Sequence, residues 1–151
     1  MTQALRTLLE HAQRQRDEAL AALQQAETAE QQLQLQAEQL HGYRLEYDAR
    51  HPARSGRSAP IELLRCHLGF MQRLQQAQAQ QQGQLQAAQA RVSRHRQALL
   101  ALEQRLAAVR KLADRRGLER QRAAHMLEQK RHDEAAQQRA WRDRVDLATP
   151  H

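Results

Sequence analysis

The sequence has few of the residues that fill a compact globular core. Its 151 residues include one Trp, two Tyr, one Phe and five Gly, and the mean hydropathy is −0.91. Ala, Gln, Leu, Arg and Glu dominate instead, which is typical of coiled coils and long helices. Apolar side chains this sparse must form a stripe along helices, so the composition predicts an all-α protein.

Cysteine, long apolar runs and catalytic motifs are also scarce. Cys66 is the single cysteine, so the chain cannot form an internal disulfide, which indicates a reducing, cytoplasmic setting. We interpret Cys66 as an inert packing residue. No stretch approaches the ~20 apolar residues that span a bilayer, and residues 1–10 do not resemble a signal peptide, so we expect a soluble protein.

The motif inventory predicts neither an enzyme nor a metal or cofactor site. The sequence contains no glycine-rich phosphate loop, no HExxH and no CxxC, and its eight histidines are dispersed. His67 and His95 fall on the apolar stripe described below, where a partly buried structural histidine is the expected role.

Two long segments free of proline flank one segment rich in helix-breaking residues. Residues 51–60 contain two Pro, one Gly and two Ser, which is the clearest loop signal in the chain. We therefore expect a single coiled-coil domain over residues 1–151. Its first helix would span about 5–50 and its second about 61–146, folded as a two-helix antiparallel coiled-coil hairpin with a longer second helix.

A heptad stripe runs along the first helix. Ten of its thirteen positions are apolar or aromatic, as in a coiled-coil seam. In the second helix the stripe is strongest from Leu85 to Ala113, and the glutamine-rich stretch 75–84 is expected to be loosely packed. The seam of the first helix consists of Leu5, Leu9, Ala12, Arg16, Ala19, Leu23, Ala26, Glu30, Leu33, Ala37, Leu40, Arg44 and Tyr47.

The position of the loop suggests how the helices pair. With the loop centred near residue 55, the numbers of facing residues add up to roughly 110, because a short connection makes neighbouring helices antiparallel. Leu40 would then face Phe70, and Gln36 would face Leu74. The second helix beyond about residue 105 would have no partner, so its remaining apolar positions, Val109 among them, would be free to dock onto another protein.

Positive charge gathers in the last part of the chain. Residues 105–151 carry twelve Lys/Arg against seven Asp/Glu, whereas residues 1–60 carry seven against eight. This bias predicts an acidic partner. Nucleic acid is one candidate, but acidic residues interrupt the arginines and aromatic side chains are not interleaved, which favours a solvated or protein-docking face.

The aromatic side chains gather beside the loop. Tyr43, Tyr47 and Phe70 could form the core of the hairpin there. Alternatively, Tyr43 and Phe70 are offset by one residue from the seam, which indicates partial exposure and an interface role. Both interpretations stay open on the sequence alone.

Three local patterns are similar to those of one known family. The first is Gln36, Leu40, Tyr43 and Tyr47, and the second, with the same spacing of four, three and four, is Phe70, Leu74, Ala77 and Gln81. The third is the segment 128–139, EQKRHDEAAQQR, with its Lys-x-x-Asp-Glu core. Together with the two-helix layout, they give a chain that resembles the FliJ family, the small coiled-coil component of the flagellar type III export apparatus.

That resemblance implies a coiled coil similar to the rotor stalk of rotary ATPases, with several protein partners. The first two patterns would bind the export gate, the membrane protein FlhA, although Gln81 stands where the family often has His. One end would enter the pore of the hexameric export ATPase and promote ring assembly, and export chaperones would also bind. The candidate ATPase contacts are Arg116, Arg120, Arg122, Lys130, Arg131 and Arg139.

The same resemblance implies no cofactor, no nucleic acid, and a cytoplasmic position at the inner face of the cell membrane, held there through partners. Two alternatives remain from the sequence. One is the equivalent stalk protein of a virulence type III secretion system, which has a similar architecture. The other is a basic coiled-coil scaffold or nucleic-acid-binding protein, whose DNA binding would depend strongly on salt.

Overall fold

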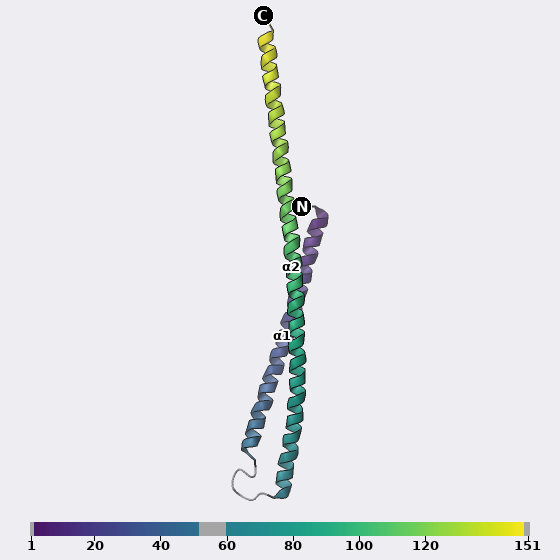
Figure 1. The fold of residues 1–151 in the computed structure, drawn as a ribbon, viewed down its shortest axis with the longest axis vertical. Helices are drawn as coiled ribbons and strands as arrows, with labels where there is room; N and C mark the ends of the chain where they lie inside the picture. Colours follow the sequence, from purple (N-terminus) through teal and green to yellow (C-terminus); the bar gives the residue numbers. More distant parts are fainter. Residues whose placement is uncertain (1, 52–59, 150–151) are drawn as a thin grey trace. The chain divides into compact units, whose positions relative to one another are not determined.

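The computed structural model describes residues 2–51 and 60–149, and these residues form two helices (Figure 1). Helix α1 spans Gln3–Ala49 and helix α2 spans Ile61–Ala148. No strand occurs in these ranges, and the expected all-α hairpin with a longer second helix is confirmed. Each helix end lies within two residues of the prediction, while most of the predicted loop, residues 52–59, lies outside the described residues.

Local sequence explains where the two helices begin. The Thr2 side-chain oxygen accepts a hydrogen bond from the Leu5 amide at 3.3 Å, which satisfies one of the unpaired donors at the start of α1. Pro60 directly precedes α2, and its carbonyl accepts a bond from the Leu64 amide at 3.2 Å. Glu62 places negative charge in the first turn of α2, where the helix dipole favours it.

The chain divides into two compact units, each built from part of both helices. Unit 1 comprises Met1–Gln13 and Gln104–His151, and unit 2 comprises Arg14–Glu103. In unit 1, buried Ala12, Leu106 and Val109 pack together with Leu9. The prediction of one domain over the whole chain stays a prediction.

Unit 2 has its own small apolar core. Leu23 and Ala26 of α1 pack against Val92 of α2, and Leu99 lies against this cluster. Leu85 and Ala88 are also buried. Single layers of small and medium side chains of this kind are what a two-helix coiled coil buries along its seam.

The predicted seam is confirmed over most of its length. Every predicted position from Leu5 to Arg44 in α1 is buried or half-buried, and so is every residue of α2 at the same four-and-three heptad spacing from Leu64 to Ala113. Positions from Arg116 onward are exposed. The heptad pattern therefore identifies the contact face of both helices correctly.

The predicted register of the hairpin was wrong by one heptad. Phe70 contacts Tyr47 rather than Leu40, and Gln36 contacts Gln81 rather than Leu74. In each case the observed partner lies seven positions from the expected one. A slip of seven residues leaves the same seam positions facing each other, so the heptad pattern cannot distinguish the two registers.

The part of α2 without a partner also begins later than expected. Val109 is buried in unit 1 instead of being available for docking, whereas every side chain from Leu118 to Thr149 is exposed. Residues 118–149 carry seven Lys/Arg against six Asp/Glu, and residues 105–117 carry five against one. The excess positive charge therefore lies mainly in the paired part of α2.

No helix in the described part of the chain combines the length and the hydrophobicity that crossing a bilayer requires.

Candidate protein-interaction site

Two aromatic rings from different helices meet near the loop-proximal end of unit 2. The ring centroids of Tyr47 and Phe70 are 4.4 Å apart, with the planes tilted by 45°. This separation lies at the short limit of the distances typical of favourable aromatic pairs, so the contact joins α1 to α2 at this level. Together with Gln36, Tyr43 and Ala77, which lie on the same side of the seam, these two rings define the aromatic flank.

The aromatic flank is accessible to a partner. Tyr43 is 54% exposed, while Phe70 is half-buried against Tyr47. Phe70 therefore contributes to the helix contact, Tyr43 has the exposure expected from its offset, and the interface role of these aromatics stays a prediction. Beside the rings, a hollow of about 340 Å³ is lined by Tyr47, Arg50, Leu63, His67 and Phe70.

Next to the aromatic flank, the seam of α2 carries the glutamines Gln78 and Gln81 in place of apolar residues. The Gln81 side-chain nitrogen donates to the Leu33 carbonyl at 3.2 Å and to the Gln36 side-chain oxygen at 3.1 Å. One level nearer the loop, Arg44 donates to the Gln78 side-chain oxygen at 3.0 Å. These bonds hold the helices together while leaving space between them, consistent with the expected loose packing around residues 75–84.

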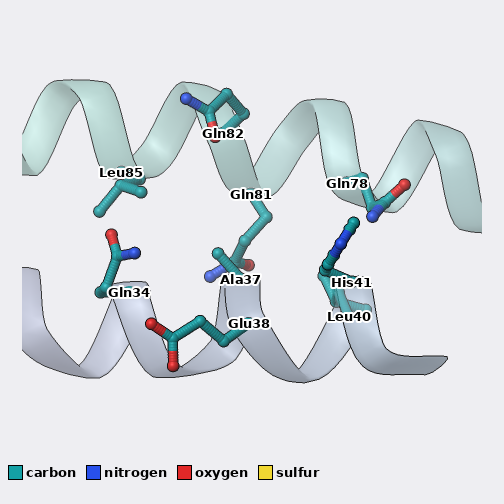
Figure 2. Close-up of a pocket in the computed structure, with 9 residues that line it drawn as sticks. All are labelled: Gln34, Ala37, Glu38, Leu40, His41, Gln78, Gln81, Gln82 and Leu85. Carbon is teal, nitrogen blue, oxygen red and sulfur yellow. The ribbon is translucent and has the colours of Figure 1, made fainter. Parts of the chain in front are cut away.

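The eight predicted gate-binding residues fall into three positions. Gln36, Tyr43, Tyr47, Phe70 and Ala77 form the aromatic flank defined above. Leu40 and Gln81 lie on the seam and line a hollow between the helices (Figure 2). Leu74 is only 8% exposed, so it supports the packing beneath the site rather than offering a contact surface.

Three residues at this end were not among the predicted gate-binding residues. Arg50, Leu63 and His67 complete the hollow beside the aromatic rings, and the spacing of seven residues from Leu63 to Phe70 was the signal that could have identified Leu63. His67 is half-buried as expected, and its ring lies 4.6 Å from that of His51. Cys66 is exposed, so its interpretation as a packing residue was wrong.

The candidate ATPase-contact residues all lie in unit 1 and are all exposed. Arg116 and Arg120, one turn apart, line a hollow together with Thr2, Glu119 and Ala123. The others follow along the unpaired part of α2. Among the described residues, no group of three or more His, Cys, Asp or Glu is placed to hold a metal ion.

Comparison with known proteins identifies the family. A family model described as the flagellar FliJ protein matches residues 1–144. The chain belongs to the flagellar FliJ protein family. No match was found among curated proteins or among solved structures. The family match includes all of α1 and nearly all of α2, so the chain is a coiled-coil protein of flagellar export over almost its whole length.

Proposed function

We propose that the protein is a stalk-like component of the flagellar protein-export apparatus. It promotes assembly of the export ATPase ring, contacts the export gate and escorts export chaperones. These partners hold it on the cytoplasmic side of the cell membrane. The observation that carries the proposal is the family match over residues 1–144, supported by the meeting of two separate residue sets on one end of the hairpin.

The aromatic flank is the gate-binding surface in this proposal. Exposed Tyr43 offers a large apolar ring with a polar tip, a side chain that frequently anchors protein interfaces. Tyr47 and Phe70 fix the spacing of the two helices beneath it through their ring contact. The Gln81 bond to Gln36 fixes the next level in the same way.

A matched pair of substitutions tests the gate contact. Tyr43 and Leu45 are 54% and 57% exposed, lie on the same helix, and face opposite sides of the seam. Tyr43→Ala should weaken binding to the purified cytosolic domain of the cognate gate protein about tenfold or more, as loss of an interface anchor does. Leu45→Ala should leave gate affinity unchanged, and both variants should retain the helix content of the parent chain.

Equal effects of the two substitutions would contradict the gate assignment. Loss of helix content in Tyr43→Ala alone would instead show that this ring is needed for packing. Affinity could be measured by calorimetry, and helix content by circular dichroism at 222 nm.

The unpaired part of α2 is the ATPase-contact region in this proposal. Because side chains 118–149 are exposed, removing residues 120–151 should leave the remaining hairpin folded and still able to bind the gate. The same truncation should abolish the effect on ATPase ring assembly. Intact ring assembly with the truncated chain would show that the two ends have been assigned wrongly.

A further inference from the structure

The residues that face each other across the seam of unit 2 are poorly matched in polarity. Ala26 packs with Val92, and the rings of His51 and His67 are in contact, so the numbers of facing seam residues add up to 118. We call each facing pair a layer, and unit 2 contains ten layers over residues 16–47 of α1. Six of these layers place a polar side chain opposite an apolar one: Arg16–Leu102, Leu23–His95, Glu30–Ala88, Ala37–Gln81, Leu40–Gln78 and Arg44–Leu74.

Two features of the observed packing follow from this mismatch. The layers Ala37–Gln81 and Leu40–Gln78 coincide with the hollow of about 360 Å³ between the helices (Figure 2). The Nε2 atom of His67 is buried and has no hydrogen-bond partner among the described residues. Side chains beside a gap lose packing contacts, and a buried polar atom without a partner costs free energy. Both features therefore weaken the observed register.

A slide of α1 along α2 by one heptad improves the match. The numbers of facing residues then add up to 111, and Ala49 comes level with the start of α2, so the connection between the helices does not have to lengthen. Six layers become apolar on both sides, and only Leu33–Gln78 is mixed. Three layers become polar on both sides: Arg16–His95, Glu30–Gln81 and Arg44–His67.

The same slide repairs both weak features of the observed packing. Leu40 would face Met71 instead of Gln78, which places apolar surface where the hollow now lies. The Arg44 guanidinium would face His67 and supply a hydrogen-bond donor for the buried Nε2 atom. The slide thus improves apolar packing and polar pairing together, the two factors that set the register of a coiled coil.

Other contacts hold the observed register in place. In unit 2 the rings of Tyr47 and Phe70 are in contact, and Gln81 donates to Gln36. In unit 1 Val109 is buried in the small apolar cluster. A slide of one heptad breaks all three contacts. The losses offset the gains, so the two registers are close in free energy.

We propose that the hairpin has a second packed register, in which α1 lies one heptad, about 10 Å, closer to the loop-proximal end of α2. In this register Tyr47 has left Phe70 and Val109 has lost its α1 partners, so the unpaired part of α2 begins about one heptad earlier. A partner that binds one register more tightly shifts the population toward it. The second register does not rest on the proposed export function, whereas its use to link the gate contact to the ATPase contact does.

Disulfide trapping in the full chain tests for the second register. Cys66→Ser removes the native thiol, and Val92→Cys then supplies one fixed thiol on α2. The other thiol is Ala26→Cys in the observed-register pair and Ala19→Cys in the second-register pair. Leu33→Cys gives the opposite pair, which would meet only after a slide of one heptad in the other direction.

The three pairs distinguish a second register from general looseness of the helices. A disulfide requires Cα atoms within about 7 Å of each other, so a pair displaced by one heptad forms a cross-link only when the helices slide. Under mild oxidation of dilute protein, the observed-register pair should form the intramolecular cross-link fastest. The second-register pair should react at least tenfold faster than the opposite pair, as followed on non-reducing gels. Equal rates for these two pairs would overturn the proposal.

A seam substitution tests whether the matching of layers sets the balance between registers. His95 faces Leu23 in the observed register and Arg16 in the second, so His95→Leu should improve the first layer and disrupt the other. The cross-linking rate of the second-register pair, relative to the observed-register pair, should then fall at least fivefold. His125→Leu makes the same change on the exposed, unpaired part of α2 and should leave this ratio unchanged.

An unchanged ratio in His95→Leu, or an equal fall in His125→Leu, would also overturn the second register. The cross-linking experiments contain no export partner. Their failure would therefore leave the proposed export function standing, and failure of the gate and ATPase experiments would leave the second register standing.

Discussion

Because the pairing of α2 with α1 ends before residue 118, Leu→Ala substitutions on the two sides of this point should affect stability very differently. Leu106 is 2% exposed and packs with Ala12 and Val109 in unit 1, whereas Leu127 is 51% exposed. The same substitution, Leu→Ala, at the two sites therefore compares a buried leucine with an unpartnered one. Helix propensity is nearly the same for both changes and cancels from the comparison.

The expected magnitudes differ several-fold. Complete burial of a leucine side chain contributes about 1.5–3 kcal/mol, and Leu→Ala in a protein core costs about 2–5 kcal/mol once the cavity is included. A two-helix layer can close partly over the gap, so we expect Leu106→Ala to lower the free energy of unfolding by about 2 kcal/mol. Leu127→Ala should change it by less than about 0.5 kcal/mol, as for other surface sites.

Thermal unfolding followed by circular dichroism at 222 nm measures both variants. For a chain of this size, 2 kcal/mol corresponds to a fall in Tm of about 4–8 °C. The Tm of Leu127→Ala should stay within about 2 °C of the parent value. Similar shifts for the two variants, or no shift for Leu106→Ala, would refute the pairing of α2 with the N-terminal segment.

Three further predictions concern unit 2 and the glycines of α2. Gln81→Leu should raise stability by about 1 kcal/mol in urea unfolding, because a polar seam residue lowers coiled-coil stability; a clear loss would show that its bonds to Leu33 and Gln36 dominate. Tyr47→Ala should destabilise the chain more than Tyr43→Ala by about 1 kcal/mol, since only Tyr47 contacts Phe70; equal Tm values would contradict this. Gly83→Ala and Gly117→Ala should each stabilise the protein by roughly 0.5–1 kcal/mol, because Ala favours the helix more than Gly does and the added Cβ meets no atom within 4 Å; a lower Tm would contradict this.

The heptad pattern predicted the helices and their contact faces but not their register. Residues from Leu5 to Ala113 follow the seam expected from their spacing, because burial of an apolar stripe requires a fixed face on each helix. Which turn of α1 meets which turn of α2 depends on particular contacts instead. The Tyr47–Phe70 ring pair and the Gln81–Gln36 bond distinguish registers that differ by one heptad, and spacing alone does not contain them.

The candidate site was also predicted only in part. The sequence located the two residue sets and brought them to one end of the hairpin, since the loop signal of residues 51–60 is strong. Leu74 was assigned to the gate surface although it is a buried seam position, and the seven-residue spacing that places Leu63 beside Phe70 was not used. The hollow between the helices in Figure 2 was missed because glutamine and histidine give no clear pattern of burial in the sequence.

The central claim is that the protein couples an export ATPase to the export gate, and ATP hydrolysis by the purified cognate export ATPase tests it most directly. The rate and the sedimentation profile of the ATPase should be recorded alone, with the full chain, and with the chain lacking residues 120–151. We expect the full chain to raise turnover and shift the ATPase toward the hexamer, and the truncated chain to do neither. No change in turnover or assembly with a folded full chain would contradict the claim.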